Sequence, residues 1–100
     1  MTWSKQKQRI HAHAHASALV ARLFEDFQET DNVGPRFSWD KFPETVSRLA
    51  KVNCFTWFPE KVKMTKALEN FAGGVAYNAA HTHLESFQRA RESNDGEPHP

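Results

Sequence analysis

Three histidines at alternate positions, His11, His13 and His15, are the residues whose type and spacing most resemble a metal site. Imidazole nitrogens bind Zn²⁺ and Ni²⁺ well, so these two ions are the natural candidates. The intervening alanines and the pattern that follows predict a helix, in which His13 points nearly opposite to the other two. Only His11 and His15 could therefore share one ion.

A complete site would need further ligands, because two imidazoles leave a structural ion with too few donors. His81, His83 and Glu85 are the residues elsewhere in the chain that could supply them. The competing interpretation is a solvated polar helix face in which alanine is filler. We adopt the second interpretation, and we expect no bound metal and no other cofactor.

Nucleophilic and acid–base chemistry finds little support in the pattern. Cys54, the single cysteine, lies among apolar neighbours, where a thiol is normally inert and part of the core. His83 falls near an apolar face, which favours a partly buried, hydrogen-bonded histidine over a general base. Gly73-Gly74 is not followed by the Gly-Lys-Ser/Thr of a phosphate loop. We therefore expect a protein that is not an enzyme.

Six aromatic rings occur within 22 residues, on both sides of the expected second helix. They are Phe37, Trp39, Phe42, Phe55, Trp57 and Phe58. Most of them would fold under the helices, but six rings are many for one short helix to cover. Because Trp and Phe also anchor protein interfaces, we expect some of these rings to form a partner surface.

Positive charge is concentrated in two segments, although the formal net charge is only +1. The first segment carries Lys5, Lys7 and Arg9, and no acidic residue precedes Glu25. The second carries Arg48, Lys51, Lys61, Lys63 and Lys66, with Glu60 as the one acidic residue among them. An apolar anchor followed by a basic rim suits a protein partner with an acidic edge.

Two functions from different classes fit these features. The first is a small protein-binding module, by analogy with accessory and inhibitor proteins of phages and mobile elements. Its contact residues would be Trp39, Trp57, Phe58, Lys61, Lys63 and Lys66, and the face with Lys5, Lys7 and Arg9 is the next candidate. The alternative is a nucleic-acid-binding protein whose basic segments contact phosphates while aromatic rings stack on unpaired bases. A homo-oligomer is compatible with either function.

Helical segments have to position these residues. Apolar side chains from Ala16 to Phe27 recur at three- and four-residue spacing, which predicts a helix over about 5–27. Phe-Pro-Glu occurs at 42–44 and again at 58–60, and each copy is a helix-start signal. These signals predict a second helix over about 43–53, with Val46, Leu49 and Ala50 buried, and a third from 59.

Two apolar stripes on nearly opposite sides follow in the third helical segment, separated by Gly73-Gly74. A bend or break at the glycines would turn both stripes to one core, whereas a continuous helix would be buried on two sides. We expect two helices, over about 59–72 and 75–91. The expected core residues are Leu23, Phe24, Phe27, Leu49, Leu68 and Phe71.

The chain has 100 residues, 39% of them apolar, which suits one small domain. We expect an all-α fold, a compact bundle of three or four helices over 1–92, with a disordered C-terminal tail over 93–100. No secretory signal and no membrane-spanning run is evident in the sequence. We therefore expect the protein in the cytoplasm, of its own cell or of a host, without membrane association.

The expected lack of a metal site makes a simple prediction about stability. Excess chelator should leave the melting temperature unchanged, because a structural ion adds its binding free energy directly to folding. Thermal unfolding followed by circular dichroism, with and without chelator, measures this. Stoichiometric zinc or nickel in protein purified without a tag and without a metal resin would overturn the expectation.

Overall fold

The computed structural model describes residues 3–29 and 39–96, without the side chains of residues 29, 88 and 90–96. Three helices make up the fold: α1 (Lys5–Glu29), α2 (Phe42–Asn53) and α3 (Lys66–Gly96). Two short 3-10 helices, η1 (Trp39–Lys41) and η2 (Cys54–Trp57), adjoin the two ends of α2. No strand occurs in these ranges, so the expected all-α class is confirmed.

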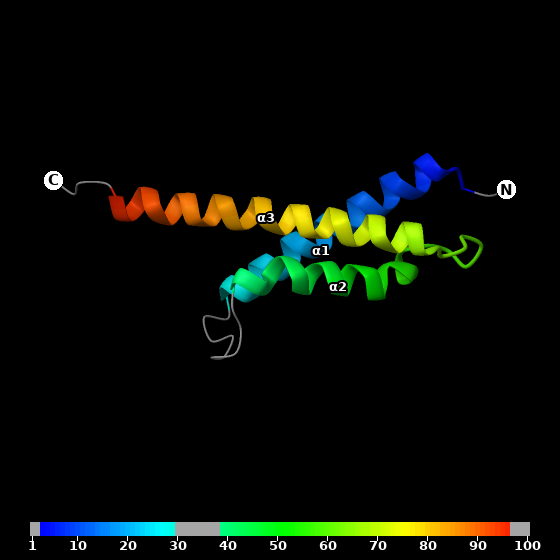
Figure 1. Ribbon diagram of the computed structural model, residues 1–100, viewed down its shortest axis with the longest axis horizontal. Helices are drawn as coiled ribbons and strands as arrows, with labels where there is room; N and C mark the ends of the chain where they lie inside the picture. The colour runs from blue at the N-terminus through cyan, green and yellow to red at the C-terminus, as the bar shows by residue number, and fades with distance from the viewer. Residues whose placement is uncertain (1–2, 30–38, 97–100) are drawn as a thin grey trace.

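The long helix α3 is the centre of the arrangement (Figure 1). It packs against both α1 and α2, which contact each other much less. α2 runs antiparallel to α3, whereas α1 and α3 both begin at the same end of the molecule (Figure 1). The fold is elongated, with extents of 63 × 27 × 18 Å.

Side-chain caps set the beginnings of the two long helices. The Ser4 hydroxyl accepts a hydrogen bond of 3.1 Å from the Lys7 backbone N–H, and Thr65 Oγ1 accepts one of 3.1 Å from Leu68. Each cap satisfies a backbone donor that has no partner within its own helix. Ser4 therefore places the start of α1 where it was expected, and α2, which has no side-chain cap, also lies close to its expected range.

The expected helix start at Pro59 is wrong. Phe58 is extended, at φ −117° and ψ 150°, and the Val62 N–H donates to the Pro59 carbonyl at 2.9 Å to close a turn. Phe58 and Val62 are each only 8% exposed, so the connection turns both side chains inward. A helix begins only at Lys66, because Thr65 is the residue that caps it.

The expected break at Gly73-Gly74 is also wrong, because α3 runs through both glycines without interruption. The helix is buried on two sides at this level, and this is the alternative arrangement for two apolar stripes on opposite sides of one continuous helix. Gly73 faces α2: its carbonyl accepts a 2.9 Å hydrogen bond from Ser47, and an added Cβ would lie 2.5 Å from Lys51 Cε. Gly73 therefore permits close approach of α2.

Small side chains form much of the core. The first core cluster joins Ala16, Val20, Phe42, Val46, Ala50, Ala76 and Ala80. The second core cluster joins Ala12, Phe58, Val62 and Leu68. Leu68 is buried as expected, and Leu23, Phe24, Phe27 and Phe71 pack against the clusters while half-buried. The expected burial of Leu49 is wrong, because this side chain lies on the outer face of α2 and is 36% exposed.

The last helix extends further toward the C-terminus than the expected domain boundary at residue 92. α3 continues through Gly96, so residues 93–96 of the expected tail are helical and residues 97–100 lie outside the described ranges. Phe37, one of the six clustered rings, also lies outside them. Within the described ranges, no helix has both the length and the hydropathy needed to cross a bilayer.

The uninterrupted course of α3 makes a prediction about its glycines. Gly74→Ala should stabilise the fold by about 0.5–1 kcal/mol, because alanine is the better helix former and no atom lies within 4 Å of the added Cβ. Gly73→Ala should gain less, because Lys51 must move aside. Urea unfolding of both variants measures the difference, and destabilisation by Gly74→Ala would contradict a straight helix at this pair.

Candidate functional site

A groove of about 700 Å³ lies where α1 and α3 begin. Its apolar lining comes from three parts of the chain: Trp3 before α1, Val62 in the connection, and Leu68 and Phe71 in the first turns of α3. The parallel course of α1 and α3 creates this site, because it brings the two helix starts to the same end of the molecule (Figure 1).

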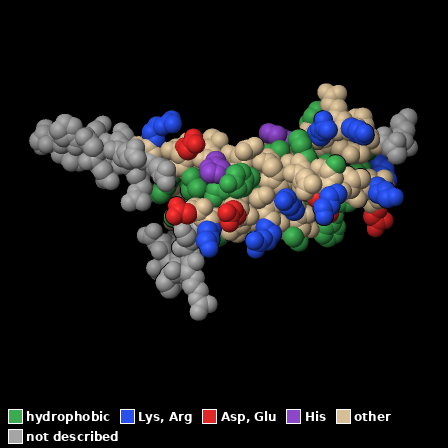
Figure 2. Space-filling view, in the orientation of Figure 1, with side chains coloured by type: hydrophobic (Ala, Val, Ile, Leu, Met, Phe, Trp, Pro, Cys, Tyr) green, Lys and Arg blue, Asp and Glu red, His purple; other side chains and the backbone are tan. Residues whose placement is uncertain are grey.

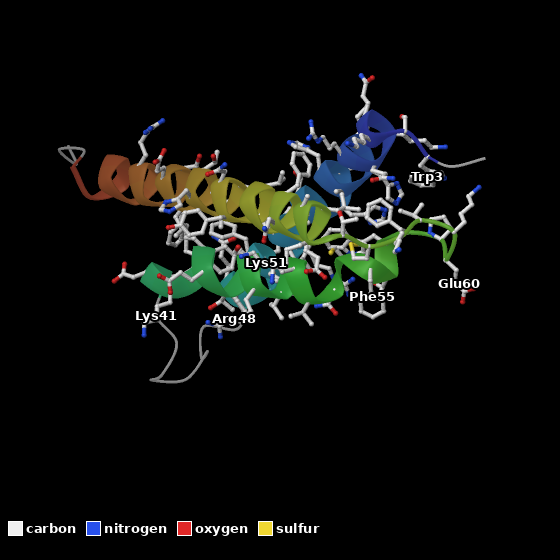
Figure 3. All side chains as sticks on the ribbon, turned by 45° about the vertical axis from the view of Figure 1, so that its right-hand side comes forward. Trp3, Lys41, Arg48, Lys51, Phe55 and Glu60 are labelled. Atoms are coloured by element: carbon white, nitrogen blue, oxygen red, sulfur yellow. The ribbon has the colours of Figure 1, made fainter. Side chains whose placement is uncertain are left out.

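The rim of the groove is basic. Lys5 and Arg9 stand on the α1 side, Lys61 and Lys63 on the side of the connection, and none of the described residues that line the groove is acidic. Lys and Arg side chains are prominent at this end of the surface (Figure 2). Glu60, the acidic residue of the connection, points outward at the tip of the molecule (Figure 3). The field at the groove is therefore positive.

Part of each basic segment of the sequence thus lines one groove, whereas Arg48 and Lys51 belong to α2 and do not line it. Lys61 and Lys63 line the groove together with Lys5 and Arg9, which the sequence offered only as a separate alternative. Lys7 stands over the Trp3 ring, 4.4 Å from its centroid, and Lys66 is the exposed first residue of α3. The positive ends of two helix dipoles add to these charges.

Trp3 is held in place from several directions. Its carbonyl accepts a 3.3 Å hydrogen bond from Gln8 Nε2, and its ring meets the edges of His11 and Phe58 at centroid distances of 5.0 and 5.8 Å. The ring remains partly exposed along one side of the groove. Trp3 is therefore a fixed apolar wall, which the sequence analysis did not select.

The rings expected as anchors lie elsewhere. Trp39 packs at the opposite end of the molecule, among Phe24, Phe42 and Phe87. Trp57 is half-buried beneath His15, with the two rings stacked at 5.6 Å, and Phe58 belongs to the second core cluster. Of the expected apolar contacts, Trp57 and Phe58 therefore lie under the basic end, and Trp39 is remote from it.

The histidines at 11 and 15 are engaged with protein groups. His11 Nε2–H donates to the Trp57 carbonyl oxygen at 2.5 Å, and the two imidazole centroids are 4.4 Å apart. Burial lowers the pKa of His15, and the neighbouring His11 lowers it further. Across the described residues, no group of three or more His, Cys, Asp or Glu side chains is placed to hold a metal ion.

Cys54 belongs to the core, as expected. It is fully buried, its Sγ donates to the Lys51 carbonyl at 3.4 Å, and it lies 3.6 Å from Met64 Sδ. Burial raises the pKa of the thiol, and the Glu69 carboxylate raises it further. A buried thiol of raised pKa is a poor nucleophile.

Comparison with known proteins does not identify a function for this chain, so the proposed function is argued from the chemistry of the groove. No family model, no curated protein and no solved structure matches this chain.

The lowered pKa of His15 predicts that acid destabilises the fold. The folded state binds a proton at His15 less readily than the unfolded chain does, so stability should fall as the pH drops below about 6.5. His15→Gln should lose less stability than the wild type between pH 7.5 and 5.5, values that bracket the ordinary histidine pKa of about 6.5. Urea unfolding at both pH values measures this.

The matched control is His13→Gln, because His13 lies on a different face of α1 from His15, whose ring stacks on Trp57. This variant should keep the pH dependence of the wild type. Equal pH dependence in the wild type and in His15→Gln would contradict the assignment.

Proposed function

We propose that this protein is a non-enzymatic binding module that takes up an acidic, apolar segment of a protein partner in the groove at the starts of α1 and α3. One observation carries the proposal: four cationic side chains surround an apolar floor, and no acidic residue is among those described as lining it. A carboxylate-rich segment with bulky apolar side chains is the complementary ligand.

The two parts of the groove have different tasks in this function. Trp3, Leu68 and Phe71 offer apolar surface, whose burial supplies affinity. The cations on the rim attract an acidic partner from a distance and reject a basic one, so they govern association rate and selectivity. By occupying a surface of its partner, such a module acts as an accessory or inhibitor protein. The cytoplasm is the compartment we propose for it, because a free cysteine is typical of a reducing environment.

Ring environment favours a protein over a nucleic acid. Lys7 lies 4.4 Å from the Trp3 centroid and Arg9 lies 5.8 Å from the Phe71 centroid. A cation over a ring covers one of its two faces, which leaves less ring surface for an unpaired base to stack on. The positive rim alone would bind phosphates without selectivity, whereas the apolar floor fits side chains.

Charge reversal in the groove tests this function. Lys61→Glu combined with Lys63→Glu should reduce partner capture about tenfold or more, because it sets two negative charges against an acidic ligand. Immobilised wild type and variant are exposed to cell lysate with and without nuclease treatment, and captured proteins are quantified by mass spectrometry.

The matched control is Lys41→Glu combined with Arg48→Glu, which reverses two exposed charges on the α2 side of the molecule (Figure 3). This control should capture the same partner as the wild type. Equal capture by all three proteins would contradict the proposal, and material that is lost entirely on nuclease treatment would identify a nucleic acid instead.

A further inference from the structure

The walls of the groove constrain the form of the segment that it holds. We infer that the occupant is an amphipathic α-helix of the partner, with its apolar stripe on the groove floor and acidic residues on both flanks. This inference rests on the proposed function and specifies its ligand.

Backbone hydrogen bonding favours a helix over an extended peptide. An extended segment leaves N–H and C=O groups to be satisfied by its receptor, usually by an exposed sheet edge. The described part of this chain contains no strand, and the caps of α1 and α3 are already engaged. Among the described residues that line the groove, the uncharged polar side chains suited to such hydrogen bonds are Gln8, Thr65 and Asn70. In a helix most backbone N–H and C=O groups are paired within the helix itself, so the ligand does not need hydrogen bonds from these side chains.

Both walls have the surface pattern onto which a helix packs. On α1 the lining residues are Lys5, Gln8 and Arg9, which have the three- and four-residue spacing of one helix face. On α3, Ala67, Asn70 and Phe71 repeat the same spacing. Side chains spaced in this way form ridges between which those of another helix can insert. Ala67 is small and exposed, so it leaves room between the walls.

The distribution of charge specifies the ligand further. Lys5 and Arg9 lie on the α1 wall, and Lys61 and Lys63 lie on the connection that leads into α3. A helix seated between them meets cations on both flanks of its apolar stripe. It therefore needs Asp or Glu on both flanks, and it gains nothing from a single acidic edge alone.

A second copy of this chain is a poor occupant. Its exposed apolar strip on α2 and η2 consists of Leu49, Val52 and Phe55, which are 36%, 62% and 61% exposed. Arg48 and Lys51 flank this strip (Figure 3). Seating it in the groove would bring cations against cations, which disfavours association.

Selection from displayed random peptides of about 16 residues, somewhat over four helical turns, tests this inference on the full-length chain. We expect enriched peptides with bulky apolar residues at positions i, i+3 or i+4, and i+7, flanked on both sides by Asp or Glu. Synthetic copies should become helical on binding, as measured by difference circular dichroism. A proline in the centre of such a peptide should abolish binding, because it breaks the helix.

A substitution that fills the groove links the selected peptides to this site. Ala67→Trp should weaken peptide binding about tenfold or more, because the new ring occupies the space between the walls. Ala18→Trp, at an exposed alanine of α1 that does not line the groove, is the matched control and should bind as the wild type does. Lys5→Glu combined with Lys63→Glu gives a second, charge-based variant with the same expected loss.

The outcomes separate this inference from the proposed function. Enriched peptides that are acidic but rich in proline, or that stay non-helical when bound, would overturn the helix while leaving a protein-binding groove. The same holds if no peptide is enriched although lysate capture depends on Lys61 and Lys63. Peptides that bind Ala67→Trp as tightly as the wild type would overturn the assignment to this groove.

Discussion

Close approach of α3 to both of its neighbours depends on small side chains along its middle. Ala72, Ala76 and Ala80 are fully buried at four-residue intervals, and Gly73 admits the Lys51 side chain of α2. Small residues let helix backbones approach closely, so packing here does not depend on large aliphatic side chains. Because α2 runs antiparallel to both long helices, α1 and α3 run parallel and begin at the same end of the molecule (Figure 1).

Large apolar side chains are consequently displaced toward the two ends of an elongated molecule. Trp39, which is partly buried, packs among phenylalanines at one end. At the other end Trp3 and Phe71 border an open groove with a basic rim. The groove where α1 and α3 begin thus combines exposed apolar surface with a lining whose charged residues, among those described, are all cationic.

Local patterns predicted much of the fold, whereas the site required topology. Periodicity and the Pro43 signal placed α1 and α2 within a few residues, but Pro59 was misread because a proline–glutamate pair also begins a simple turn. In a sequence, alanines that pack between helices cannot be told from alanines that only favour helix formation, so the close packing of α3 against both neighbours was not predicted. The basic segments were predicted, but to predict that Lys5 and Arg9 lie near Lys61 and Lys63 requires knowing that the first and third helices are parallel. Trp3 precedes its helix and has no periodic partner.

Cross-linking between lysines tests directly whether the starts of α1 and α3 lie at the same end of the molecule. A short amine-reactive reagent, followed by mass spectrometry of the native chain, should join Lys5 to Lys61 or Lys63, because all three line one groove. Lys41 should not join Lys5, because it lies toward the opposite end of the fold from Trp3 (Figure 3). Links between Lys41 and Lys5, with none from Lys5 to the 61–63 segment, would contradict a groove built from both helix starts.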